Sequence, residues 1–364
     1  MEDPAAAPAL FELRITADKG AGLFALQDIP RGTRITAEDP ILVLPPDTAL
    51  TDYHLHFERM TPDQHNRFSE LASVDYTIKP TLMQSIRQRL QAKYSGSALD
   101  SAVADCVKMY RIFKTNSVDM GMSGSLGAGI FPLYSRMNHS CRRNVHNTYN
   151  ETIGKETIHA IRDIKAGEEL VTSYIHSSVL TYEDRQETLH KRWGFECRCE
   201  ACEDPKFEES EQRRQRLQRL GKGIAVYERN DRFLTHFAGQ PVPRDDADVL
   251  SWWEECVRLF KEEGMVGYNL SAAYRRCSQY ALKLGHGAKA LAYARKELEI
   301  ERVCMGDETD HLKEGMEGAK FWIEHLGKLS EQDAVIDRMN QKREGKEDKK
   351  AAKKAAKKAA KSKQ

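Results

Sequence analysis

The sequence predicts an α+β protein in which a β-rich region, split by a helical insertion, is followed by an all-helical domain. Short strand-like segments separated by glycine turns fill the first 45 residues and return between residues 126 and 175. Between these two stretches, and again after residue 205, the apolar residues take the spacing of helices. At 364 residues, the chain is long enough for about two domains with ordinary cores.

The first strands are predicted from alternation. Phe11, Leu13 and Ile15 alternate with polar residues, and the pattern breaks at residues 20–22, Gly-Ala-Gly. A second turn, at residues 30–32, precedes another short strand. This combination of short strands and glycine turns is typical of a compact β region.

A hairpin and a capped helix are predicted in the second β region and directly after it. Residues 144–149 and 157–161 have strand patterns, and residues 150–154 between them form the turn. Thr181, with Asp184 three residues later, is a suitable cap for the helix that follows. The β region is therefore predicted to end in a helix just before a cysteine-rich segment.

Helices are predicted for the rest of the chain up to its tail. One apolar stripe ends at residues 285–287, Gly-His-Gly, and a second stripe marks the next helix. The first stripe consists of Leu270, Ala273, Tyr274, Cys277, Ala281 and Leu284, and the second of Leu291, Ala294 and Leu298. Consecutive antiparallel helices of this length are similar to tetratricopeptide hairpins, although the sequence shows no fixed period. Residues 341–364, rich in Lys and Ala, are predicted to be disordered when free.

The composition is typical of a soluble globular protein, with 40% apolar and 30% charged residues. No apolar run approaches the roughly 18 residues of a membrane span, and the acidic N-terminus is unlike a signal peptide. We therefore expect an intracellular protein, in the nucleus or the cytoplasm, without membrane contact. Its eight cysteines are then expected to be reduced thiols or metal ligands.

Charge is divided unevenly along the chain. Residues 341–364 hold eleven basic and three acidic residues, a balance of +8, so residues 1–340 carry −7 within the net charge of +1. An acidic body suits a basic protein or peptide as partner, and the tail suits weak, salt-sensitive contact with nucleic acid. The tail has no aromatic residue to stack on a base, so a purely solubilising role is the alternative.

Three cysteines lie within six residues of one another: Cys197, Cys199 and Cys202. Such spacing lets one loop wrap a tetrahedral ion, but three thiolates leave one position open. The candidate for the fourth ligand is Cys141, with His139 and His190 as alternatives. The segment is therefore predicted to hold structural zinc. The remaining cysteines lie in helical patterns and are expected in cores: Cys106, Cys256, Cys277 and Cys304.

Four short motifs follow one another along the chain. The first is Lys-Gly-Ala-Gly-Leu at residues 19–23, and the second is Asn-His-Ser-Cys at residues 138–141. The third is Gly-Glu-Glu-Leu at residues 167–170, with Tyr174 shortly after it, and the fourth is Phe-x-Cys-x-Cys-x-x-Cys at residues 195–202. In this order the motifs resemble the signatures of the SET-domain family of protein lysine methyltransferases, over a little more than half of the chain.

Within that family the chain is similar to the SET-and-MYND subgroup, which also has a split SET domain and a helical C-terminal domain. The resemblance implies a SET domain at 1–205, a tetratricopeptide-like helical domain at 206–340 and a tail at 341–364. It divides the SET domain into an N-terminal part (9–45), a helical insertion (46–115), a core (116–176) and a post-SET segment (177–205). Residues 45–105 contain no cysteine, so the MYND zinc module of the subgroup is absent.

The resemblance also implies transfer of a methyl group from S-adenosylmethionine to a lysine of a protein, histone or non-histone. It assigns the catalytic role to Tyr174, whose hydroxyl orients the amine, and makes Val118 and Trp193 walls of the lysine channel. The implied ligands of structural zinc are Cys141, Cys197, Cys199 and Cys202. The residues implied to bind the cofactor are Lys19, Gly20, Gly22, Asn116, Ser135, Asn138, His139, Tyr174 and Phe195.

Two other functions are alternatives. An inactive SET-like scaffold would bind protein partners through its helical domain, and two departures from the family pattern favour it. Arg143 stands where the family usually has proline, and Val118 stands where an aromatic residue often lines the channel. A nucleic-acid-binding zinc protein would instead depend on the basic tail. The presence of Tyr174, Asn138 and His139 favours the active enzyme, which we expect to be a monomer.

Overall fold

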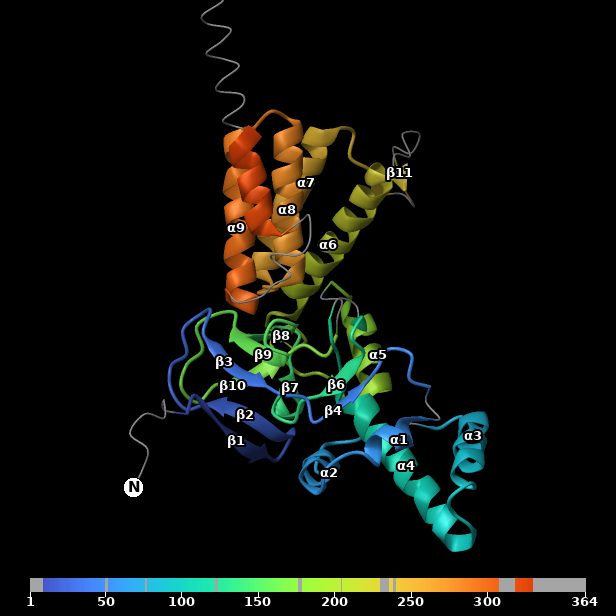
Figure 1. The fold of residues 1–364 in the computed structure, drawn as a ribbon. Helices are drawn as coiled ribbons and strands as arrows, with labels where there is room; N and C mark the ends of the chain where they lie inside the picture. The colour runs from blue at the N-terminus through green and yellow to red at the C-terminus, as the bar shows by residue number, and fades with distance from the viewer. Residues whose placement is uncertain are drawn as a thin grey trace, which may run out of the picture.

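The computed structural model describes residues 9–49, 52–75, 77–121, 124–175, 179–203, 205–229, 236–237, 240–307 and 318–329. The strands of residues 11–172 form the middle of the molecule, with the helices of the predicted insertion on one side and the C-terminal helices on the other (Figure 1). The tail at residues 341–364 lies outside the described residues. Among the described residues, none of the helices combines the length and the apolar character needed to traverse a bilayer.

One sheet joins three of the four sequence motifs. Its strands, in order, are β1 (Phe11–Thr16), β2 (Gly20–Ala25), β10 (Glu169–Thr172) and β7 (Asn138–His139). β2 pairs antiparallel with both β1 and β10, and β7 pairs in parallel with β10. Because Leu170 lies opposite Leu23 and Val171 lies opposite Asn138, motifs that are far apart in the sequence meet across β10.

Two three-stranded sheets complete the β region. One has the order β3 (Arg34–Glu38), β9 (Lys155–Ala160) and β8 (Val145–Asn150), and the other β4 (Leu42–Leu44), β6 (Ala128–Ile130) and β5 (Val118–Asp119). The hairpin formed by β8 and β9 occupies the place predicted for it from the sequence. Its apolar side chains pack with those of β2, β3 and β10 in one core: Leu23, Ala25, Ile29, Ile35, Met137, Val145, Ile158, Ala160, Ile164 and Leu170.

Four helices form the insertion: α1 (Tyr53–Phe57), α2 (Pro62–Ser69), α3 (Pro80–Leu90) and α4 (Gly96–Asn116). The start of α2 is fixed by a capping box, because the Thr61 side chain accepts from the Gln64 amide and the Gln64 side chain accepts from the Thr61 amide. The long helix α4 buries Ile112 and Phe113 in the same core as Leu42 and Leu44 of β4. The insertion is thereby anchored to the β region.

The helix α5 (Tyr182–Trp193) leads from the β region to the cysteine-rich segment. The Thr181 hydroxyl accepts a hydrogen bond from the Asp184 amide, as the sequence predicted. Gly194 ends the helix in the left-handed conformation, with φ of 74°, where a residue with a side chain would be strained. This turn directs Phe195 and the cysteines that follow back towards the β region.

The C-terminal region is predominantly helical. Its main helices are α6 (Phe207–Glu228), α7 (Asp246–Glu262), α8 (Tyr268–Lys283) and α9 (Gly287–Met305), and residues 319–329 are helical as well. α7, α8 and α9 lie side by side, while α6 runs obliquely (Figure 1). Small buried residues let α8 and α9 approach closely, among them Ala281 and Ala294. A short hairpin of β11 (His236–Phe237) and β12 (Gln240–Pro241) interrupts the helices, because Pro241 and Pro243 cannot supply the amide hydrogens of a helix.

Candidate metal centre and active site

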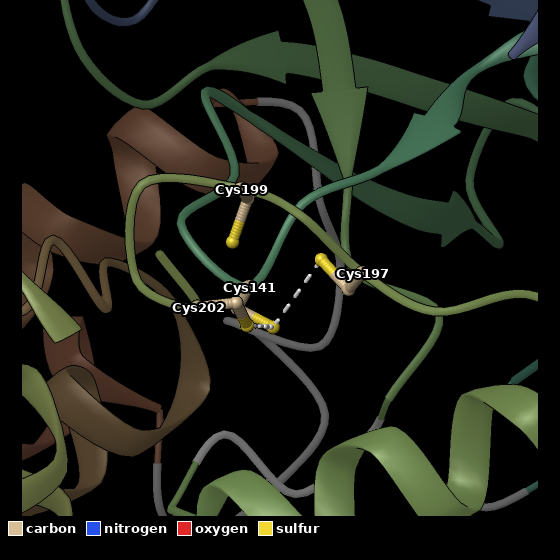
Figure 2. A group of neighbouring side chains, drawn as sticks. All are labelled: Cys141, Cys197, Cys199 and Cys202. Atoms are coloured by element: carbon tan, nitrogen blue, oxygen red, sulfur yellow. Dashed lines mark hydrogen bonds between the residues drawn. The ribbon is translucent and has the colours of Figure 1, made fainter. Parts of the chain in front are cut away.

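Four thiols from two segments converge beneath the cysteine-rich turn. Cys141 follows β7, and the other three follow α5: Cys197, Cys199 and Cys202. Their sulfur atoms all lie within 4.8 Å of one another and face a common centre (Figure 2). The Sγ atom of Cys141 lies 3.9 Å from that of Cys197 and 3.6 Å from that of Cys202. Four sulfurs about 2.3 Å from a tetrahedral zinc ion lie about 3.8 Å apart, so this arrangement fits structural zinc.

Of the three candidates for the fourth ligand, the structure brings Cys141 to the other thiols. His190 is exposed on α5, and His139 contacts the cluster through Cys141 rather than through the common centre. Hydrogen bonding among the thiols raises the pKa of Cys141 and lowers that of Cys199.

Two buried arginines lie beside the thiol cluster and add positive charge to its surroundings. A zinc ion with four thiolates carries a formal charge of −2. The Nη2 atom of Arg185 lies 3.7 Å from the Cys202 sulfur, and Arg214 donates to the Cys141 carbonyl oxygen at 3.3 Å. The side chain of Arg214, which belongs to α6, is fully buried and also pairs with Glu263 at 3.2 Å. The helical domain therefore contributes directly to the surroundings of the metal centre.

His139 connects the thiol cluster to Tyr174. Its Nδ1 atom accepts a hydrogen bond from the Tyr174 backbone amide at 2.9 Å, and its Nε2 atom lies 3.4 Å from the Cys141 sulfur. Because a backbone amide can only donate, Nδ1 carries no proton, and Nε2 donates towards the sulfur. Burial lowers the pKa of His139 to about 4, which agrees with a neutral ring.

Two aromatic side chains of the segment that ends α5 lie against the Tyr174 ring. The ring centroid of Tyr174 lies 5.1 Å from that of Trp193 and 6.3 Å from that of Phe195, which meets it edge-on. The Tyr174 hydroxyl donates to the Met137 carbonyl oxygen at 2.7 Å, and burial raises the pKa of the phenol. The indole of Trp193 is itself held by a 3.2 Å hydrogen bond to the Thr115 carbonyl at the end of α4. The half-buried phenol thus stays protonated and fixed in orientation.

A polar cluster lies where β2, β10 and β7 pair with one another. The Glu169 carboxylate accepts from the ammonium group of Lys19 at 2.9 Å and from the side-chain amide of Asn138 at 2.7 Å. Gly22 lies against this pair, since a Cβ atom there would come within 2.9 Å of the carboxylate. Gly20 takes a positive φ of 73° at the start of β2, a conformation that favours glycine. Lys19, Gly22 and Asn138, three residues assigned to cofactor binding, are therefore brought together.

Three other predicted site residues have local contacts. The Asn116 amide donates to the Ala72 and Ile112 carbonyl oxygens, and the Ser135 hydroxyl donates to the Phe131 carbonyl oxygen. Val118 pairs with Gly129 in the ladder between β5 and β6. The side chains of Asn116 and Ser135 thus stabilise a helix end and a turn. The assignment of these two residues to the cofactor, and of Val118 to the channel, stays a prediction. Arg143, which replaces the usual proline, donates to the Val266 carbonyl at 3.0 Å and thereby joins the β region to the C-terminal helices.

Sequence reasoning did not assign three residues that the geometry places in this region. Glu169 belongs to the third motif but was given no role. Arg185 lies on α5, four residues before the buried Leu189 and on the same helix face. This spacing was the one sequence signal that Arg185 is buried. Arg214 lies in a run of charged residues that gave no sign of burial.

Comparisons with known proteins agree with the motifs. Residues 20–175 match the family model described as "SET domain". The chain is 28% identical over 332 residues to "Histone-lysine N-methyltransferase set5" of Schizosaccharomyces pombe, covering 86% of this chain and 89% of that protein. It is 44% identical over 77 residues to human "N-lysine methyltransferase SMYD2", covering 21% of this chain and 17% of that protein. A solved SET domain of LSMT, bound to lysine and AdoHcy, aligns over 91% of this chain and 89% of its own at 13% identity, with a TM-score of only 0.30.

Proposed function

We propose, from the premise that residues 20–175 are a SET domain, that this chain is an S-adenosylmethionine-dependent protein-lysine methyltransferase. One observation carries the proposal: two different environments meet at the short strands β7 and β10. Lys19, Asn138 and Glu169 form a polar cluster there. The phenol of Tyr174, among aromatic rings, donates to the carbonyl of Met137, the residue before Asn138. Such an arrangement suits a zwitterionic cofactor bound next to a buried amine. The activities named for the fission-yeast and human relatives support the same reaction.

The aromatic surroundings of Tyr174 suit the chemistry of a lysine amine. A lysine with a pKa near 10.4 must lose its proton before it attacks a methyl group, at a cost of about 4 to 5 kcal/mol near neutral pH. Burial among Tyr174, Trp193 and Phe195 disfavours the charged ammonium form and lowers this cost. The departing proton would pass to solvent, leaving a neutral amine. Its nitrogen could then accept the methyl group of a bound sulfonium, with the carbon–sulfur bond breaking to leave the thioether of S-adenosylhomocysteine.

Tyr174 orients the amine through its oxygen. Because the hydroxyl hydrogen is donated to the Met137 carbonyl, the oxygen lone pairs are left to accept from the amine N–H groups. A fixed acceptor of this kind directs the nitrogen lone pair along a single line, which is where proximity contributes most. The cofactor, when bound, supplies the methyl group from its sulfonium. Lys19, Gly22 and Asn138 would hold its aminoacyl end, and Phe195 would cover its adenine.

The four-thiol centre has a structural part in this proposal. Zinc held by Cys141, Cys197, Cys199 and Cys202 would order a segment too short to bury a core of its own. That segment carries Phe195, whose ring meets both Tyr174 and His139. Metal binding would therefore fix the aromatic wall without taking part in the reaction.

The partners and location follow from charge and from the relatives. We propose a lysine in a basic protein or peptide, histone or non-histone, as the substrate, because residues 1–340 carry a net charge of −7. The basic tail at residues 341–364 would add weak contact with nucleic acid. We also propose that the chain acts as a monomer inside the cell, in the nucleus or the cytoplasm.

The test is methyl transfer from labelled S-adenosylmethionine into the proteins of a cell lysate. The wild-type chain is expected to label proteins at lysines that mass spectrometry then maps. Tyr174→Phe should retain binding of S-adenosylhomocysteine but lose about 100-fold or more of the transfer rate, because the acceptor for the amine is removed. Equal labelling by both proteins would contradict the role of Tyr174. A wild-type chain that binds no cofactor would instead favour the inactive scaffold.

A further inference from the structure

The Glu169 carboxylate bridges two side chains assigned to the cofactor. Its Oε2 atom accepts from the Lys19 ammonium group at 2.9 Å, and its Oε1 atom accepts from Nδ2 of Asn138 at 2.7 Å. The Glu169 side chain is 15% exposed, whereas that of Lys19 is 48% exposed. The carboxylate therefore lies behind the lysine, where it restrains both neighbours and leaves Lys19 open to a ligand.

This bridge fixes which end of the Asn138 amide faces outward. One hydrogen on Nδ2 goes to Glu169, and the other goes to the Ala21 carbonyl oxygen at 3.1 Å. In the flipped amide, the oxygen of Asn138 would face two acceptor oxygens and lose both hydrogen bonds. The carboxylate thus holds the nitrogen inward, and the Oδ1 atom of Asn138 is turned away from the bridge as an acceptor.

The same carboxylate keeps Lys19 charged and in place. Burial lowers the pKa of Lys19, but the hydrogen bond and the negative charge of Glu169 outweigh that effect, and the pKa is raised overall. An ammonium group has three hydrogens, of which Glu169 takes one. The rest of the group is left to donate to an anion on its exposed side.

Gly22 makes this geometry accessible. A Cβ atom at this position would lie 2.9 Å from Oε1 of Glu169 and 3.0 Å from Nδ2 of Asn138. Both contacts would be unusually close, so a larger residue would displace the ends of the Glu169 and Asn138 side chains. Glycine lets the backbone of β2 pass directly beside the bridge without displacing them.

We propose that Glu169 is the positioning residue that selects a ligand with an amino-acid end, by presenting Asn138 Oδ1 to its ammonium group and Lys19 to its carboxylate. This inference rests on the proposed function, since S-adenosylmethionine and S-adenosylhomocysteine both carry such an end. The negative charge of Glu169 also complements the ammonium group of the ligand. Glu169 acts through its two neighbours and need not touch the ligand itself.

The test compares two ligands by titration calorimetry on the full chain. S-adenosylhomocysteine has the amino-acid end, and 5′-methylthioadenosine has the same nucleoside and sulfur but lacks that end. Glu169→Gln is expected to weaken binding of the first by about 10- to 100-fold, because charged hydrogen bonds are lost, and to change binding of the second by less than about 3-fold. In the methyl-transfer assay, the KM for S-adenosylmethionine should rise while kcat stays within about 3-fold.

Glu168→Gln is the matched control, since this adjacent carboxylate instead accepts from Arg162 at 2.7 Å and from the Lys165 amide at 2.8 Å. It should leave the affinity for both ligands unchanged. If Glu169→Gln weakened both ligands equally or neither, the inference would be overturned while the proposed function stood. If the wild type bound neither ligand, both would fall.

Discussion

The backbone amide of Tyr174 donates a 2.9 Å hydrogen bond to Nδ1 of His139. The opposite nitrogen of the same ring lies 3.4 Å from the Cys141 sulfur. One neutral imidazole therefore connects a predicted metal ligand to the backbone of the predicted catalytic residue. This contact links the thiol cluster to the backbone at Tyr174.

We expect His139→Phe to loosen both ends of this connection. The variant keeps an aromatic ring of similar size but removes the donor to the Cys141 sulfur, so zinc affinity should fall by about 10- to 100-fold. Competition with a chromophoric chelator measures this change. His190→Phe is the control, because His190 is exposed on α5. Unchanged zinc affinity in His139→Phe would show that the ring does not support the metal centre.

We also expect the chain to bind one zinc ion and to depend on it for cofactor affinity. Elemental analysis should find about one zinc per chain in the wild type and a clear loss in Cys199→Ala. Cys106→Ala is the matched control, since Cys106 is buried in the core shared by α3 and α4. Chelation should abolish binding of S-adenosylhomocysteine, because Phe195 would no longer be held where it covers the adenine of the ligand. Zinc-free protein with full affinity would contradict this dependence.

The sequence predicted which residues form this site better than it predicted which of them contact one another. Spacing alone indicated the cysteine triplet, and the core positions predicted for Cys106, Cys256, Cys277 and Cys304 are confirmed. The bridge from Lys19 through Glu169 to Asn138 depends on the register of β2, β10 and β7, which no local pattern encodes. A charged residue such as Arg214 gives no sequence signal of burial, because its burial depends on partners in distant segments. The hydrogen bonds of Asn116 and Ser135 similarly depend on backbone geometry, which residue type does not reveal.

Breaking the buried pair of Arg214 should destabilise the protein far more than breaking an exposed pair on the same helix. Arg214→Met leaves the fully buried Glu263 with weaker compensation and removes the hydrogen bond to the Cys141 carbonyl. Because Arg213 still pairs with Glu263 at 2.6 Å, the cost should be about 2 to 3 kcal/mol of unfolding free energy, less than for a buried charge left unpaired. Arg216→Met, which breaks the half-exposed pair with Glu255, should cost about 1 kcal/mol or less. Urea denaturation measures both, and similar losses would argue against a buried link between α6 and the thiol cluster.

Glu156 should make the stability of the β region depend on pH. It is fully buried on β9, directly opposite Glu38 of β3, and burial followed by the charge of Glu38 raises its pKa to about 8. Its Oε1 atom accepts from Asn147 at 2.9 Å, while Oε2 has no hydrogen-bond partner among the described residues. Glu38 instead accepts from the backbone amides of Leu133 and Tyr134, so it is the better site for the negative charge.

The sign of the effect follows from where the proton is bound. Between about pH 4.5 and pH 8 the folded chain keeps the Glu156 proton and the unfolded chain releases it, so stability falls as the pH rises through this window. Glu156→Gln imitates the protonated acid at every pH. We therefore expect the variant to match the wild type at pH 5 and to be more stable by about 3 kcal/mol at pH 8.5. Chemical denaturation at the two pH values tests this, with the pH 5 comparison as the internal control. If the variant and the wild type differed in unfolding free energy by the same amount at both pH values, Glu156 would already be ionised in the folded chain at pH 5.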